Sequence, residues 1–228
     1  LDKLEYLMAL ASERHFGRAA EISGVTQPTL SAGIKQLEEQ LGVLLVQRGS
    51  RFIGFTPEGE RTLDWARRIV SDSRAMRQEI TALKRGLNGR LKIAAIPTAL
   101  AMVAAITTPY RARHPDVRFT ILSQTSIQIL TNLENLEIDA GITYLDNEPL
   151  GRVQTIPLYQ ERYLLLTSPD APLGDRDKVT WAEAANVPLC LLTPDMQNRR
   201  ILDDLLRSAG GNPQPTLESN SVVVLFAH

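Results

Sequence analysis

The polar side chains best placed for intermolecular chemistry lie in the segment Val25–Gly42, which reads VTQPTLSAGIKQLEEQLG. Apolar residues recur on it at Leu30, Ile34, Leu37 and Leu41, which is the spacing of one buried helix face. The other faces carry hydroxyl, amide and ammonium groups that can form hydrogen bonds with a partner. Such groups are either ordinary surface polarity or a binding surface, and the elements around them decide between the two.

The elements around this segment form a helix-turn-helix pattern followed by a hairpin. Residues 4–10 and 16–22 show helical apolar spacing, and Gly24 ends the second run. Thr26 is a good N-cap for the next helix, and Pro28 suits its first turn, where a missing N–H costs little. Two helices separated by the short turn SGVT are typical of a helix-turn-helix. The runs VLLVQR and RFIGFT then predict a two-stranded wing.

A long helix is predicted over residues 57–88. Thr56 can cap it, and Pro57 suits its first position. Its apolar residues follow an alternating three-four spacing that usually packs on a partner chain, although a helix lying on its own domain is the alternative. The residues of this seam are Ala66, Ile69, Met76, Ile80, Leu83 and Leu87.

From residue 89 onward the pattern changes to alternating strands and helices. LKIAAI, VRFTIL and IDAGITY predict strands with helices between them, an order that indicates parallel pairing and right-handed crossovers. YLLLTS, LCLLTP and PTLES predict three further strands, again separated by helices. We therefore predict an α+β multi-domain protein. It comprises a winged helix-turn-helix over 1–58, a linker helix over 57–88 and an α/β domain over 89–228, whose two lobes, 89–150 and 151–228, enclose a cleft.

Composition and charge exclude several classes of protein. No apolar run approaches the roughly 20 residues that cross a bilayer, and the charged N-terminal residues differ from a signal peptide. The single cysteine, Cys190, cannot form an internal disulfide, which fits a reducing cytoplasm, and its place in LCLL predicts a buried side chain. Residues 1–90 hold 14 Lys+Arg against 11 Asp+Glu, whereas residues 91–228 hold 11 against 15. A basic front and an acidic rear predict that the front meets a polyanion.

The first 90 residues resemble the DNA-binding region of LysR-type transcriptional regulators. The resemblance rests on FGRAAEISGVTQPTLSAGIKQLEEQLGV and QRGSRFIGFTPEGE. Ala32, Gly33 and Val46 depart from the family pattern, which leaves the base preference open. Residues 91–228 are similar to the family's effector-binding region through RLKIAAIPT, RARHPDV and the IDAGI strand. This implies two lobes of periplasmic-binding-protein type. Because family members run further, we expect a C-terminal part beyond His228.

The resemblance implies that the polar segment enters the major groove of double-stranded promoter DNA. Gln27 would pair with adenine edges, and Thr29 and Ser31 would bond bases or phosphates. Basic residues of the helices and wing would hold phosphates and fix the register. The predicted DNA contacts are Arg18, Thr26, Gln27, Pro28, Thr29, Ser31, Lys35, Arg48 and Arg51. The linker seam would form an antiparallel homodimer, and the effector lobes would add contacts that make a homotetramer.

Hydroxyl residues at predicted strand-to-helix corners form the candidate effector site. Helix N-termini aimed into a cleft bind small anions, and the alternative is that each hydroxyl only caps its helix. The resemblance, in which these loops hold the effector, favours binding by Thr98, Ala99, Thr125, Ser126, Thr193 and Pro194. The corners show no lysine or arginine. We therefore predict one small carboxylate or similar oxyanion as the effector, with a neutral metabolite as the rival.

No catalytic pattern is visible in the sequence. Cys190 lies in an apolar run, and His15, His114 and His228 show no metal-ligand spacing. We expect no catalytic residue, metal, cofactor or membrane partner, and a cytoplasmic regulator that is not an enzyme. The alternative is a solute-binding or enzymatic α/β domain with an accessory helix-turn-helix, and the ordered motifs of the first 60 residues favour the regulator.

Overall fold

The computed structural model describes residues 1–48, 52–85, 87–151, 153–212 and 214–228. Leu1–Gly89 makes up the bulk of one compact unit, and the chain from Arg90 onward makes up the bulk of a second. No helix in the described ranges is long and apolar enough to cross a bilayer.

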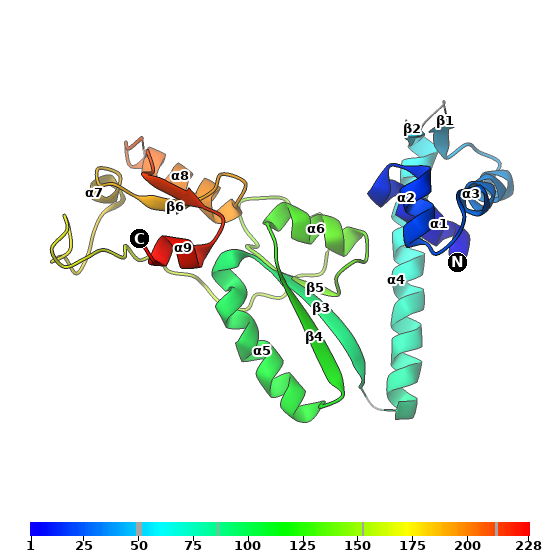
Figure 1. The fold of residues 1–228 in the computed structure, drawn as a ribbon, viewed down its shortest axis with the longest axis horizontal. Helices are drawn as coiled ribbons and strands as arrows, with labels where there is room; N and C mark the ends of the chain where they lie inside the picture. Colours follow the sequence, from blue (N-terminus) through cyan, green and yellow to red (C-terminus); the bar gives the residue numbers. More distant parts are fainter. Residues whose placement is uncertain (49–51, 86, 152, 213) are drawn as a thin grey trace. The chain divides into compact units, whose positions relative to one another are not determined.

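The first unit is a winged helix-turn-helix followed by one long helix (Figure 1). Its elements are α1 (Asp2–Glu13), α2 (Phe16–Ile22), α3 (Gln27–Leu41), β1 (Val46–Arg48), β2 (Phe52–Phe55) and α4 (Pro57–Arg85). Leu30, Ile34 and Leu37 of the apolar stripe of α3 are buried in the core with Leu7, Leu10 and Leu63. Leu41, which was also predicted for the stripe, is the last residue of the helix and is 50% exposed. The sequence-based prediction of these elements is confirmed.

Local signals in the sequence explain where α2 and α3 begin and where α3 ends. His15 caps α2 by accepting a hydrogen bond from the backbone N–H of Arg18. Thr26 caps α3 in the same way from Thr29, with Pro28 in the first turn. At the other end Gly42 closes α3 with φ of 70°, a backbone conformation that glycine adopts without strain.

The second unit begins with a three-stranded sheet. Its elements are β3 (Gly89–Ala95), the short 3-10 helix η1 (Pro97–Ala99), α5 (Leu100–Arg113), β4 (Val117–Ser123), α6 (Ser126–Glu134) and β5 (Ala140–Ile142). The strand order is β4-β3-β5, and β3 pairs with β5 in parallel, as predicted. Ala94, Val103 and Ile129 join the sheet, α5 and α6 in one core. Gly141 permits this contact, because a Cβ there would lie 2.3 Å from Cγ2 of Ile129.

The second lobe is a smaller parallel sheet with short helices. Its elements are α7 (Trp181–Ala184), β6 (Cys190–Leu192), α8 (Gln197–Ser208), β7 (Leu217–Ser219) and α9 (Val222–Phe226). β6 pairs with β7 in parallel, from Cys190 opposite Leu217 to Leu192 opposite Ser219. Arg199 of α8 is buried, and it donates to the Leu192 carbonyl at 2.9 Å and pairs with Asp203 at 2.8 Å.

Two predictions for this lobe are wrong. YLLLTS forms no strand, and its Leu164 and Leu166 are 90% and 71% exposed. A strand needs a partner for its backbone groups, and no strand of the described chain pairs with this segment. Cys190 is exposed rather than buried, since it is the first residue of a strand in a sheet of only two strands.

Candidate nucleic-acid interface and effector site

The first turn of α3 presents its polar residues to solvent. Thr26, Gln27, Pro28 and Thr29 are exposed, and Ser31 is half-buried. The hydroxyls of Thr26 and Thr29 lie 2.9 Å apart and share a hydrogen bond, so the cap also orders the side chain of Thr29. The arrangement is a capped helix end whose amide and hydroxyl groups are exposed at the surface.

Of the basic residues predicted to hold phosphates, the structure describes the side chains of Arg18 and Lys35, and each of these lies near a carboxylate. Arg18 is exposed and bonds Glu13, with its Nε 3.2 Å from the carboxylate and an N–H 2.9 Å from the carbonyl oxygen. Lys35 is exposed and lies 3.8 Å from Glu39, a loose pair along the helix. The side chain of Arg48 and the whole of Arg51 lie outside the described residues.

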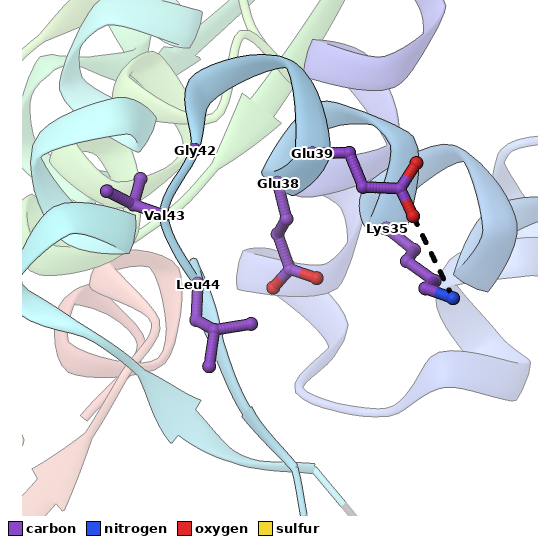
Figure 2. A pocket seen from close by; sticks show the side chains of 6 residues that line it. All are labelled: Lys35, Glu38, Glu39, Gly42, Val43 and Leu44. Atoms are coloured by element: carbon purple, nitrogen blue, oxygen red, sulfur yellow. Dashed lines mark ion pairs between the residues drawn. The ribbon is translucent and has the colours of Figure 1, made fainter.

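A buried carboxylate fixes the loop between α3 and the wing. Oε1 of Glu38 accepts hydrogen bonds from the backbone N–H groups of Leu45 at 2.9 Å and Val46 at 3.1 Å. Glu38 borders a hollow of about 360 Å³. In Figure 2 its side chain is directed toward the loop, whereas Lys35 and Glu39 pair with each other. A side chain of α3 therefore fixes the position at which β1 begins.

The other side of the same loop contacts the start of α4. The backbone N–H of Thr56 donates to the Leu45 carbonyl at 2.9 Å, and its hydroxyl donates to the Leu44 carbonyl at 2.6 Å. The same hydroxyl accepts from the N–H of Gly59 at 2.9 Å, which caps α4. A Cβ on Gly59 would lie 2.0 Å from the Leu45 oxygen, so this position needs glycine.

Gly33, which departs from the family pattern, has a packing explanation. It is buried in α3, and a Cβ there would lie 2.7 Å from Cδ2 of Tyr6. The small residue lets Tyr6 of α1 pack closely against α3, which offsets the cost of about 1 kcal/mol that glycine carries inside a helix.

The seam of α4 divides between core and surface. Ala66 is fully buried in the core of its own unit, so its side chain has no surface to offer a partner, and we withdraw it from the seam. The other five residues predicted for the seam are exposed, between 44% and 82%: Ile69, Met76, Ile80, Leu83 and Leu87. Leu87 lies beyond α4, because the helix ends at Arg85 and not at residue 88 as predicted. Trp65, which the sequence reading missed, adds a 53% exposed ring one turn before Ile69.

In the second unit, Thr98 belongs to a cluster of polar side chains around Tyr144. Its hydroxyl lies 3.4 Å from the Tyr144 hydroxyl, which also accepts from Nδ2 of Asn198 at 2.9 Å and donates to the Glu161 carboxylate. Burial, and then the hydrogen bond to Glu161, raise the pKa of Tyr144 well above its usual value. Tyr144 therefore stays protonated and donates its hydrogen to Glu161.

Ser126 and Pro194 meet at a second cluster, and it contains an arginine that the sequence reading missed. Arg200 lies beside Glu148, with an N–O distance of 2.6 Å, and donates to the carbonyl of Pro194 at 3.1 Å. Ser126 is buried, and its hydroxyl lies 3.4 Å from both Glu148 and Arg200. The expectation that these corners lack basic residues is wrong, because the first turn of α8 brings Arg200 to the corner occupied by Ser126.

The remaining predicted effector residues differ in whether their polar groups already have hydrogen-bond partners. Thr125 caps α6, since its hydroxyl accepts from the N–H of Gln128 at 3.2 Å and its own N–H donates to the Gln128 side chain at 3.0 Å. Ala99 is buried, and its N–H donates to the Ile96 carbonyl. The Thr193 hydroxyl is buried and has no hydrogen-bond partner within the described chain.

Tyr144, Glu148, Glu161, Asn198 and Arg200 are the site residues that sequence reasoning missed. One signal could have found some of them, because Tyr144 follows β5 and α8 follows β6, and in each of the two sheets binding groups are expected beyond the carboxyl ends of the parallel strands. In the described ranges no group of three His, Cys, Asp or Glu side chains could hold a metal ion.

Two family models match along this chain. Residues 1–60 match the bacterial regulatory helix-turn-helix protein, lysR family, and residues 84–228 match the LysR substrate binding domain. The chain belongs to the LysR family. This is a family of transcription regulators, not of enzymes, so the alternative of an enzymatic domain is set aside.

Several relatives of this chain are named as hydrogen peroxide-inducible genes activators or as OxyR. The chain is 31% identical over 88% of its length to the hydrogen peroxide-inducible genes activator of Haemophilus influenzae. It is 33% identical over 83% of its length to the DNA-binding transcriptional dual regulator OxyR of Escherichia coli. It spans 64% and 62% of those two proteins, respectively. A solved full-length OxyR of Pseudomonas aeruginosa, with one cysteine substituted, matches 98% of this chain and 74% of its own, with a TM-score of 0.69 and 29% identity.

Proposed function

We propose that this chain acts as a LysR-type transcription regulator in the cytoplasm and binds double-stranded promoter DNA through α3 and the wing. The observation that carries the proposal is the exposed, capped first turn of α3, held on the core by Leu30 and Ile34. Gln27 reads base edges, while Arg51 and the other basic residues hold phosphates.

Two substitutions separate these roles. Gln27→Ala is expected to reduce discrimination between operator and random DNA by about 1–3 kcal/mol, because a bidentate base contact is lost. Arg51→Ala is expected to weaken binding to both DNAs equally, since a phosphate contact carries no sequence information. Fluorescence anisotropy with both DNAs measures this, and Gln40→Ala, at the far end of the same helix, is the matched control. Equal losses on both DNAs for Gln27→Ala would exclude its proposed role.

The exposed apolar face of α4 supports a homodimer. Leaving Ile69, Met76, Ile80 and Leu83 in water is unfavourable, and a second copy of the helix can bury them. We infer an antiparallel homodimer through α4, with further contacts between effector domains that make a homotetramer.

A small effector bound between the two lobes is the proposed signal. The groups available are the neutral hydroxyls around Thr98 and Tyr144, and the guanidinium of Arg200 beside Ser126. The second cluster supports a small carboxylate or other oxyanion, because Arg200 and the Ser126 hydroxyl can both donate to it.

The names of the relatives make hydrogen peroxide a second candidate signal. Cys190 is exposed and is the only thiol among the 228 residues, so oxidation could not form a disulfide within them. A peroxide response of this chain should therefore be lost in Cys190→Ser. DNA binding measured before and after peroxide treatment tests this, and an unchanged response in Cys190→Ser would exclude a thiol as the sensor.

A further inference from the structure

The first turn of α8 is linked to the segment that follows β5 by side-chain contacts at three successive places. The Gln197 amide donates to the Asp146 carbonyl at 3.1 Å, and the Asn198 amide donates to the Tyr144 hydroxyl at 2.9 Å. The third contact is the ion pair between Arg200 and Glu148, with N–O distances of 2.7 and 2.6 Å. The ion pair therefore joins the two lobes within the second unit.

Arg200 stays in position independently of Glu148. Its guanidinium donates to the carbonyl oxygens of Pro194 at 3.1 Å and Asp195 at 2.8 Å. A third N–H lies 3.4 Å from the Ser126 hydroxyl. The guanidinium and this buried hydroxyl thus form a preorganised set of hydrogen-bond donors for one carboxylate, and the carboxylate present is that of Glu148.

The exposure of this pair differs from that of the neighbouring ion pair on the same helix. The side chains of Arg199 and Asp203 are 8% and 13% exposed, so that pair is enclosed in the lobe. The side chains of Arg200 and Glu148 are 33% and 26% exposed. A small anion from solvent can therefore reach Arg200, and two carboxylates cannot share the position because they repel each other.

We propose that Glu148 is an internal competitor that occupies the carboxylate position at Arg200 and Ser126, and that a small carboxylate effector binds by displacing it. The inference rests on the proposed effector site between the lobes. Displacement would release the ion pair that joins α8 to the segment after β5. Effector binding would then be coupled to the arrangement of the lobes, through the difference in affinity between the two arrangements.

The test measures acetate binding to the 228-residue chain by isothermal titration calorimetry. Glu148→Gln removes the competing charge, and we expect acetate to bind about fivefold more tightly than to the wild type, the upper end for a partly exposed ion pair. The double variant Glu148→Gln/Arg200→Ala should lose this gain. Asp170→Asn removes the same charge from an exposed turn and should match the wild type.

Equal acetate affinity in Glu148→Gln and the wild type would overturn the inference, as would tight binding that survives Arg200→Ala. Circular dichroism checks that each variant is folded. If Glu148→Gln is unfolded, Glu148→Asp replaces it, because the shorter side chain withdraws the carboxylate from Arg200 and should also increase acetate binding. DNA binding by Glu148→Gln is measured in parallel. If Glu148→Gln binds DNA but shows no gain in acetate affinity, only this inference is rejected. If the folded wild type does not bind operator DNA, the proposed function is rejected.

Discussion

Replacing Glu38 with alanine should destabilise the DNA-binding unit strongly, because this buried side chain holds two backbone N–H groups. Glu38 accepts hydrogen bonds from the backbone N–H groups of Leu45 and Val46. These two residues are 0% and 2% exposed, so water cannot replace the lost acceptor without a rearrangement. Leaving a buried donor unsatisfied costs about 1–3 kcal/mol, so the two donors together predict a loss of about 2–6 kcal/mol. The loop before β1 would also lose its attachment to α3, and DNA affinity should fall with it.

Urea unfolding followed by far-ultraviolet circular dichroism measures this loss. Glu39→Ala is the matched control, because Glu39 is the next residue of the helix and is exposed, with only a 3.8 Å pair to Lys35. Its effect should stay within about 0.5 kcal/mol. Glu38→Gln keeps a carbonyl acceptor without the charge and should lie between the two. An unfolding midpoint for Glu38→Ala equal to that of Glu39→Ala would refute the reasoning.

Three further predictions concern packing, a buried ion pair and assembly. Gly59→Ala should lower the free energy of unfolding by about 1–3 kcal/mol, since its Cβ would clash with the Leu45 carbonyl; thermal unfolding measures this, and an unchanged melting temperature would contradict it. Arg199→Ala should cost about 1–3 kcal/mol in the same assay, because the Leu192 carbonyl and the mostly enclosed Asp203 carboxylate lose their bonds to this buried guanidinium, whereas Arg207→Ala, at an exposed side chain, should cost about 0–1 kcal/mol. Leu83→Asp should shift the sedimentation coefficient toward that of a monomer, and a dimer that persists in this variant would remove Leu83 from the interface.

The sequence alone determined the local elements of this protein. Helix starts and ends depend on residues that are neighbours in the chain, such as Thr26 with Pro28 and the glycine at position 42, so they can be read before any fold is known. The apolar stripe of α3 likewise identified its buried face, because the period of a helix fixes which residues share a side. The order of strands and helices identified the parallel pairing, because a helix that crosses over between two strands lets the second strand run in the same direction as the first.

Contacts between distant residues were decided only by the tertiary structure. Ala66 fits the pairing seam by spacing, yet it is buried, because burial depends on what packs against a helix. YLLLTS has the composition of a strand, but a strand also needs a partner that no local pattern can supply. Arg200 and Glu148 are 52 residues apart, and only the fold brings their opposite charges together. The candidate effector site therefore depended on long-range packing, whereas the candidate DNA surface was visible in one short helix.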